Sequence, residues 1–189
     1  MVLVICPGVH SSLWTTHFLH QLDEQLPDAR LGRLVFPADL EYPWSPFTLR
    51  RFLADQAIAP DAPLVFLAFS AGCVAAVGTA YYWTQQGRQV SAVIALDGWG
   101  VPLVGPFVGY RLSHDAFTHQ TSACLGRTVP SFYADPPVSH QKLWCNPAQV
   151  KGWQVDNSFA CRENLATRTT ALQFLVACLR QHSQVLASF

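Results

Sequence analysis

Charged residues are scarce in this chain of 189 residues, and neither sign predominates. Only 13% of the residues are Asp, Glu, Lys or Arg, and 12 basic residues balance 12 acidic ones. Binding to nucleic acid needs a basic field, so that class is disfavoured and a neutral small-molecule partner is favoured. With 50% hydrophobic residues, the chain is expected to form a single domain, residues 1–189, with its own core.

The sequence also lacks the common signatures of metal, cofactor and membrane sites. Its six cysteines show no C-x-x-C spacing, so we expect no metal and no cofactor, and reduced thiols in the cytoplasm. The opening MVLVICPG has no basic region and no A-x-A pattern, and it is expected to be a strand, not a signal peptide. Polar residues and glycines interrupt the longest apolar runs, which argues against a membrane span.

The most informative stretch is APLVFLAFSAGCVAAVGTAYYWTQQG, residues 62–87. Its first part, Leu64–Phe69, is almost uninterrupted aliphatic and aromatic sequence, which is typical of a parallel strand buried on both faces. From Ala71 onward small helix-forming residues follow, and Gly87 stands where a C-terminal cap belongs. Ser70 therefore lies at the junction of a strand and a helix.

Residues Ala68 to Gly72 read A-x-S-x-G, a variant of the G-x-S-x-G nucleophile elbow. Turning from strand to helix in so few residues requires small neighbours and a strained backbone angle at Ser70. We expect this turn to expose the hydroxyl above the carboxyl edge of the sheet. Serine is also a favoured N-cap, so the alternative is that Ser70 only caps the helix.

Expected strands and helices alternate along the rest of the chain. The expected strands are Val2–Cys6, Leu31–Phe36, Val90–Leu96 and Val129–Ala134, and the expected helices begin after Ser11 or Ser12, at Ser45-Pro46 and at Asn164, the last ending at His182. This alternation predicts an α/β fold, a doubly wound and mostly parallel sheet of about five to six strands with helices on both faces. Ligands are then expected at the carboxyl edge.

Residues 101–126 are too many for an ordinary connection between two elements. We expect them to form a lid or an excursion over the sheet edge, with Val101 to Tyr110 as an apolar wall and a short helix from Ser113 stopped by Gly126. The alternative is an insertion that completes the core.

A serine hydroxyl becomes a good nucleophile only beside a base, usually a histidine held by a carboxylate. With its elbow at Ser70, the chain resembles a small member of the α/β-hydrolase family, of the serine esterase or lipase kind, over nearly its whole length. The family has the chain order nucleophile, acid, histidine. The resemblance implies His140 as the base, because it follows the last expected strand in a proline-bounded loop, with Pro147 at H-x6-P spacing. His114 and His119 are the alternatives.

Two aspartates are candidates for the acid. Asp97 ends the strand after the elbow, a position that some small family members use. Asp135 ends the next expected strand, which is the more usual family position, but it lies very close to His140 in sequence. We favour Asp97, and the alternative role for it is to bind loop amides.

Stabilising the oxyanion of acyl transfer requires N–H donors. The resemblance implies the amide of Ala71 and one from the loop after the first strand, where we favour Val9 over His10. Here the chain has Pro7-Gly8 in place of the family's common His-Gly pair. The same loop lacks the G-x-G-x-x-G of a nucleotide site, so nucleotide binding is disfavoured.

Together these features predict a serine hydrolase that cleaves a small-molecule carboxylic ester or thioester through an acyl-enzyme. Ser70 would attack, His140 would transfer the proton, and Asp97 would orient the histidine. The apolar residues from Val101 to Tyr110 favour an apolar acyl group. The competing hypotheses are an inactive binding protein on the same fold and an acyltransferase.

Overall fold

The computed structural model describes residues 1–27, 32–126, 128, 130–156 and 165–184. The strands, in chain order, are β1 (Val2–Cys6), β2 (Gly32–Val35), β3 (Leu64–Phe69), β4 (Val90–Leu96), β5 (Val108–Ser113), β6 (Ser131–Ala134), β7 (Lys151–Asp156) and β8 (Leu165–Thr170). The helices are α1 (Ser12–Gln25), α2 (Pro46–Ala54), α3 (Gly72–Gln85), α4 (Ala116–Ala123), α5 (His140–Cys145) and α6 (Ala171–Gln184), with a 3-10 turn η1 (Pro147–Gln149).

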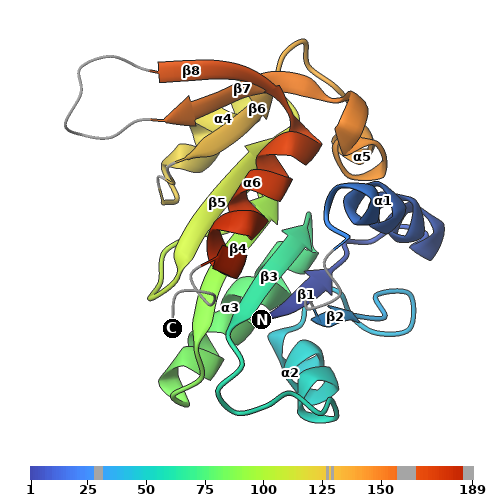
Figure 1. Ribbon diagram of the computed structural model, residues 1–189, viewed down its shortest axis with the longest axis vertical. Coiled ribbons are helices and arrows are strands. Elements are labelled where there is room, and N and C mark those ends of the chain that lie inside the picture. The colour runs from blue at the N-terminus through green and yellow to red at the C-terminus, as the bar shows by residue number, and fades with distance from the viewer. Residues whose placement is uncertain (28–31, 127, 129, 157–164, 185–189) are drawn as a thin grey trace.

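The strands form one sheet in the order β2-β1-β3-β4-β5-β6-β7-β8. From β2 to β6 all neighbours are parallel, and β7 and β8 extend this end of the sheet with antiparallel pairing. Figure 1 shows α6 crossing one face, with α1 and α5 on the same side, while α3 lies behind the sheet. The predicted α/β class, with helices on both faces of a mostly parallel sheet, is confirmed.

Two hydrophobic cores cover the two faces, and the alternation of side chains along β3 divides its residues between them. All six residues of β3 are buried. Val65, Leu67 and Phe69 pack with α1, α5 and α6. Leu64, Phe66 and Ala68 pack with α2 and α3. A strand buried on both faces, as the uninterrupted apolar run predicted, therefore places Ser70 at the centre of the carboxyl edge.

The elements with the clearest sequence signals lie where they were expected. β1, β3 and β4 have the predicted bounds. Ser11 and Ser45 cap α1 and α2, and Pro46 opens α2. Leu31, Val129 and Asn164, at which three expected elements begin, lie outside the described residues.

The segment 101–126 differs from the expected excursion over the sheet edge. Its middle is β5, which pairs with β4 on one side and β6 on the other, so it is an inner strand. The expected short helix exists as α4, which begins after Asp115. The sequence obscured β5 because a glycine and the charged Arg111 interrupt its apolar pattern. The alternative of an insertion that completes the core fits this structure.

The C-terminal part also contains more strand than expected. β8 occupies the first residues of the helix expected from Asn164 to His182, and α6 begins only at Ala171. β7 was not predicted, because its residues, KGWQVD, are mostly polar. The sheet therefore has eight strands, where five to six were expected. Among the described residues, no helix is both long and apolar enough to cross a membrane.

Candidate active site at the carboxyl edge of the sheet

Ser70 connects β3 to α3 with a φ of 53°, in the left-handed region that residues other than glycine rarely adopt. Its N–H donates to the carbonyl of Leu96 (2.9 Å), and its carbonyl accepts from the N–H of Cys73 (3.0 Å). The N-cap of α3 is Ala71, and no side chain caps this helix. The alternative role of Ser70 as a helix cap is therefore wrong, and the strained turn predicted from the sequence is present.

Two glycines allow the elbow to lie against the loop that follows β1. A Cβ atom on Gly72 would lie 2.1 Å from the carbonyl oxygen of Cys6, and one on Gly8 would lie 3.0 Å from the Cβ of Ser70. Gly72 has no room for a side chain, and a side chain at Gly8 would require its neighbours to shift. This contact brings the loop that carries Val9 next to the nucleophile candidate.

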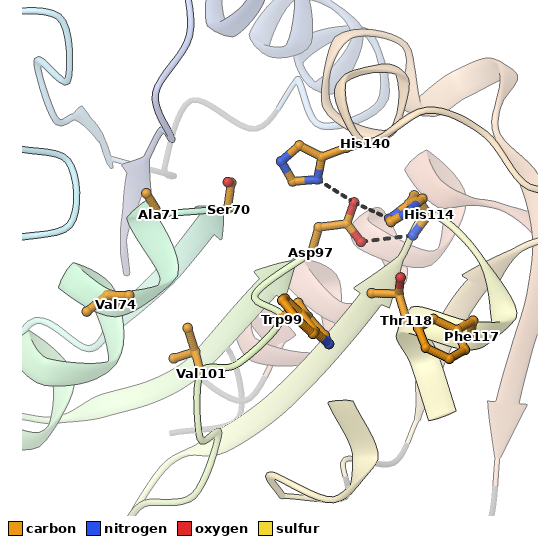
Figure 2. Close-up of a pocket in the computed structure, with 10 residues that line it drawn as sticks. All are labelled: Ser70, Ala71, Val74, Asp97, Trp99, Val101, His114, Phe117, Thr118 and His140. Atoms are coloured by element: carbon orange, nitrogen blue, oxygen red, sulfur yellow. Dashed lines mark hydrogen bonds and ion pairs between the residues drawn. The ribbon is translucent and has the colours of Figure 1, made fainter. Parts of the chain in front are cut away.

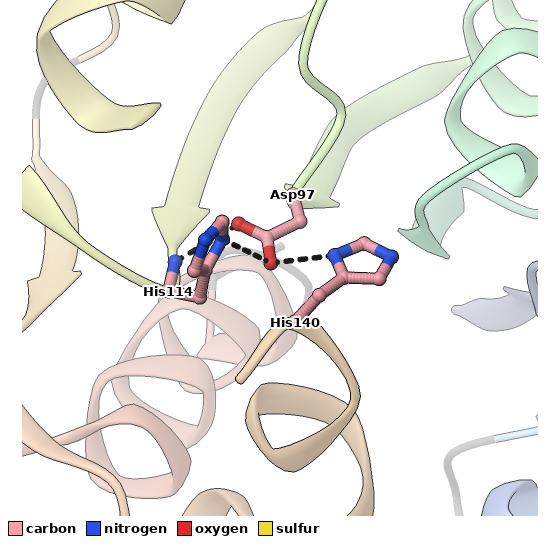
Figure 3. Close-up of side chains that lie close together, drawn as sticks. All are labelled: Asp97, His114 and His140. Atoms are coloured by element: carbon pink, nitrogen blue, oxygen red, sulfur yellow. Dashed lines mark hydrogen bonds and ion pairs between the residues drawn. The ribbon is translucent and has the colours of Figure 1, made fainter. Parts of the chain in front are cut away.

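Asp97 follows β4 and also has a positive φ, 49°. Its side chain is only 2% exposed. One carboxylate oxygen, Oδ1, accepts the backbone N–H of His114 at 2.9 Å. The other, Oδ2, lies 2.9 Å from Nδ1 of His140 and 2.9 Å from Nδ1 of His114 (Figure 3). A single buried carboxylate therefore holds two imidazole rings.

His140 is the first residue of α5, and its ring stacks on Phe69 with the centroids 4.5 Å apart. Because a carboxylate only accepts, the bond to Asp97 places a proton on Nδ1 and leaves Nε2 of the neutral ring as a proton acceptor. Figure 2 shows Ser70 and the free edge of the His140 ring on facing sides of one pocket. Within the described residues no hydrogen bond joins the two side chains, as is common before substrate binds.

The two amides expected to bind the oxyanion differ in their position. Ala71 lines the pocket beside Ser70, whereas Val9 is 72% exposed and does not line it. Within the described residues neither N–H donates to a backbone carbonyl, so both are available to a ligand. The side chain of His10, the alternative residue, packs against Trp14 with ring centroids 5.5 Å apart.

The pocket at this edge has a volume of about 390 Å³. It is lined by Ser70, Ala71, Val74, Asp97, Trp99, Val101, His114, Phe117, Thr118 and His140. One side carries the polar groups and the other is largely apolar (Figure 2). Its size and its few convergent polar groups are typical of a small-molecule site.

A comparison with solved structures finds the same architecture elsewhere. The chain is similar to YbtT, described as a type II thioesterase from the yersiniabactin NRPS/PKS biosynthetic pathway, with a TM-score of 0.52 and 18% identity, covering 78% of this chain and 88% of that one. The fold is that of the α/β-hydrolases. At this identity the likeness extends to the fold alone. No protein-family model and no curated protein matches the sequence.

In this α/β-hydrolase fold, two of the alternative candidates from the sequence, Asp135 and His119, lie apart from the pair of Asp97 and His140. Asp135 accepts hydrogen bonds from Trp153 Nε1 (2.8 Å) and Arg168 Nη1 (3.1 Å). The ring of His119 packs against Tyr133, with centroids 5.1 Å apart, and does not line the pocket.

His114 lies beside Asp97, whereas the sequence analysis considered it only as an alternative base. The hydrogen bond to Asp97 raises the pKa of His114, partial burial opposes this, and Asp97 and Asp115 raise it further by their charge. Nε2 of His114 is 3.4 Å from a carboxylate oxygen of Asp115. Its two ring nitrogens therefore face two carboxylates, so His114 suits a role in holding Asp97.

The apolar side of the pocket comes mostly from residues that the sequence did not indicate. Of the wall expected from Val101 to Tyr110, only Val101 lines the pocket, and Tyr110 is buried with its hydroxyl on His182. Trp99 and Phe117 supply the large apolar surfaces, although they are 68% and 70% exposed. The available signal for Trp99 was a large aromatic residue two positions after Asp97, in the loop that follows β4.

Proposed function

We propose that this protein is a serine hydrolase that cleaves a carboxylic ester or thioester through an acyl-enzyme. The observation that carries the proposal is the hydrogen bond of 2.9 Å between Asp97 and His140 Nδ1, on the same pocket as a serine held at a positive φ. A buried acid, an oriented imidazole and a strained serine are the three parts that acyl transfer requires.

In the proposed reaction, Ser70 Oγ attacks the acyl carbonyl while Nε2 of His140 takes the hydroxyl proton. Asp97 stabilises the imidazolium through its bond to Nδ1. The amides of Ala71 and Val9 donate to the oxyanion, a contribution of about 2.7–4 kcal/mol for each donor. The imidazolium then gives its proton to the leaving alcohol or thiol, and water, deprotonated by the same ring, releases the acid and restores Ser70.

The apolar side of the pocket supports an apolar acyl group as the substrate portion. Trp99, Val101 and Phe117 line it. The description of the structural neighbour as a thioesterase supports thioesters within the substrate class. The five described cysteines are free thiols, which supports the proposed cytoplasmic location.

The test is site-directed labelling combined with turnover. A fluorophosphonate probe is expected to label Ser70, identified by mass spectrometry, and Ser70→Ala is expected to lower hydrolysis of acyl esters and acyl thioesters by more than about 10³-fold. Ser12→Ala, at an exposed serine outside the pocket, is the matched control and should keep full turnover. Labelling of another residue, or full turnover by Ser70→Ala, would refute the mechanism.

Two other functions use the same scaffold. A binding protein without catalysis could have the same fold and pocket, because a fold alone does not establish activity. A wild-type chain that binds acyl ligands but neither turns them over nor reacts with the probe would support this reading. Acyl transfer to an alcohol or amine uses the same residues, and analysis of the products separates it from hydrolysis.

A further inference from the structure

Asp97, His114 and His140 form a cluster with more ligand atoms than acyl transfer requires. One ligand atom from each residue, a carboxylate oxygen of Asp97 and a ring nitrogen of each histidine, lies within 4.8 Å of the other two. Both imidazoles lie 2.9 Å from the same carboxylate oxygen (Figure 3). The proposed mechanism uses only one of the two histidines. With the second histidine, the cluster offers three possible metal ligands, two imidazole nitrogens and one carboxylate oxygen.

We propose that these three side chains form a Zn²⁺ site, and that zinc bound there inhibits the hydrolase. The binding is independent of the proposed function, whereas the inhibition rests on it. The sequence has no compact metal motif because the ligands come from three separated places: the ends of β4 and β5 and the start of α5.

The donor set and its geometry favour zinc. Imidazole nitrogen and carboxylate oxygen are common zinc ligands, whereas Mg²⁺ and Ca²⁺ prefer oxygen alone. A tetrahedral zinc with bonds of about 2.0–2.2 Å holds its ligand atoms roughly 3.3–3.5 Å apart. The distances of 2.9 Å and at most 4.8 Å bracket this range, so small side-chain rotations suffice. The fourth position would open on the pocket.

Asp115 supplies the outer hydrogen bond that metal-binding histidines usually have. Its Oδ2 lies 3.4 Å from Nε2 of His114, the nitrogen that carries the proton when Nδ1 binds a metal. The structure therefore offers His114 in the orientation that a zinc ligand requires.

Inhibition follows from the nitrogen that zinc occupies. When Nδ1 of His140 binds zinc, the neutral ring carries its proton on Nε2. That nitrogen then cannot accept the proton of Ser70, and the carboxylate of Asp97 is engaged by the metal. Zinc and the catalytic tautomer of His140 thus exclude each other.

Equilibrium dialysis with metal analysis tests the site itself. The wild-type chain is expected to bind one Zn²⁺, and Mg²⁺ and Ca²⁺ should not compete. His114→Phe should weaken binding more than about tenfold, and Asp115→Asn by about tenfold. Ser70→Ala should bind as wild type does. His20→Phe, at a surface histidine, and Cys124→Ser, at an exposed thiol, are matched controls for adventitious binding. Circular dichroism verifies that each variant is folded.

Fluorophosphonate labelling in the presence of Zn²⁺ tests the inhibition, with each variant compared with its own zinc-free rate. Zinc is expected to slow labelling of the wild type, and much higher zinc should be needed for His114→Phe. Zinc binding without any labelling would refute the proposed hydrolase and leave the metal site intact. Labelling that zinc does not slow, stimulation by zinc, or unchanged affinity in His114→Phe would overturn this inference.

Discussion

Ser70 and Asp97 share a backbone conformation that L-residues with side chains seldom adopt. Their φ values are 53° and 49°, and each directly follows one of the paired strands β3 and β4, whose last residues, Phe69 and Leu96, are register partners. Backbone strain of this kind costs of the order of 1–3 kcal/mol per residue. It is held by hydrogen bonds, since the Ser70 N–H donates to Leu96 and the Asp97 N–H to Leu112. Two strained turns therefore place both side chains at one sheet edge.

At the same scale, the role of Asp97 can be tested with Asp97→Asn. The amide keeps the shape of the side chain but has only one acceptor oxygen, so it favours the tautomer of His140 with the proton on Nε2. We expect kcat for acyl esters to fall by about 10³–10⁴-fold. Asp135→Asn, which alters the other strand-end aspartate, should keep the turnover of folded protein. If Asp97→Asn keeps more than a tenth of the activity, Asp97 does not have this role.

Among the elements, β5 determines how residues 101–126 are fixed beside the pocket. Its Arg111 is 4% exposed and donates to three carbonyl groups. The acceptors are Val101 (2.9 Å), Leu125 (3.0 Å) and Gly126 (3.1 Å). Burial lowers the pKa of Arg111, but a guanidinium stays charged in proteins. Arg111 thus joins the segment before β5, at Val101, to the segment after α4, at Leu125 and Gly126.

Arg111→Met measures this contribution. Methionine retains much of the volume but removes one donor from each of three carbonyls, of which Leu125 keeps the N–H of Leu103, so the free energy of unfolding should fall by about 2–4 kcal/mol. Denaturant unfolding of the purified protein gives the value. Arg51→Met removes an exposed arginine that pairs with Glu41, and it should change stability by no more than about 0.5 kcal/mol. Equal effects of the two substitutions would contradict the role of Arg111.

Across the whole molecule, the elements predicted from the sequence are those in which apolar residues occupy the positions that the fold buries. β3 is a continuous apolar run, β4 is apolar apart from Ser91, and Ser45-Pro46 is an unambiguous start for α2. β5 was not predicted because its arginine is buried through tertiary hydrogen bonds that no local pattern indicates. β7 and β8 were missed because antiparallel pairing at the end of the sheet stabilises sequences that are largely polar.

The site was predictable to the extent that it depends on strand ends. Asp97 and His140 are 43 residues apart in the chain and were both chosen, and the structure joins them by a hydrogen bond. Between the two strand-end aspartates, the sequence favoured Asp97 only because Asp135 lies so close to His140 in the chain, and the structure pairs Asp97 with His140 and Asp135 with Trp153 and Arg168. His114 was placed in an excursion because β5 was not foreseen. As the residue after a strand parallel to β4, it lies beside Asp97.

The stability of the whole molecule is expected to depend on pH because a histidine of α6, His182, is partly buried where this helix packs on the sheet. Nε2 of His182 lies 3.0 Å from the hydroxyl of Tyr110, and burial lowers the pKa of His182. The folded state therefore disfavours the protonated ring, and stability is lost as the pH falls below the ordinary histidine value of about 6.5. The pKa of Tyr110 is raised to about 12, so Tyr110 stays neutral in this range.

His182→Gln isolates this contribution. Between pH 7.5 and 5.5 the Tm of the variant should fall by about 1–2 °C less than that of the wild type, as measured by differential scanning fluorimetry. The comparison of two chains is needed because the raised pKa of His114 acts with the opposite sign, adding stability at low pH that is lost as the pH rises. Identical pH profiles for the two chains would contradict a buried, neutral His182.

Phe69 links the two residues of the proposed proton transfer, Ser70 and His140. Its ring lies under that of His140 at 4.5 Å and against that of Trp144 at 5.2 Å, and it immediately precedes Ser70. In the proposed reaction, the proton donor Ser70 therefore follows Phe69 directly in the chain, and the acceptor His140 stacks on the Phe69 ring. A displacement of Phe69 would therefore move the backbone of Ser70 and the surface on which His140 stacks at the same time.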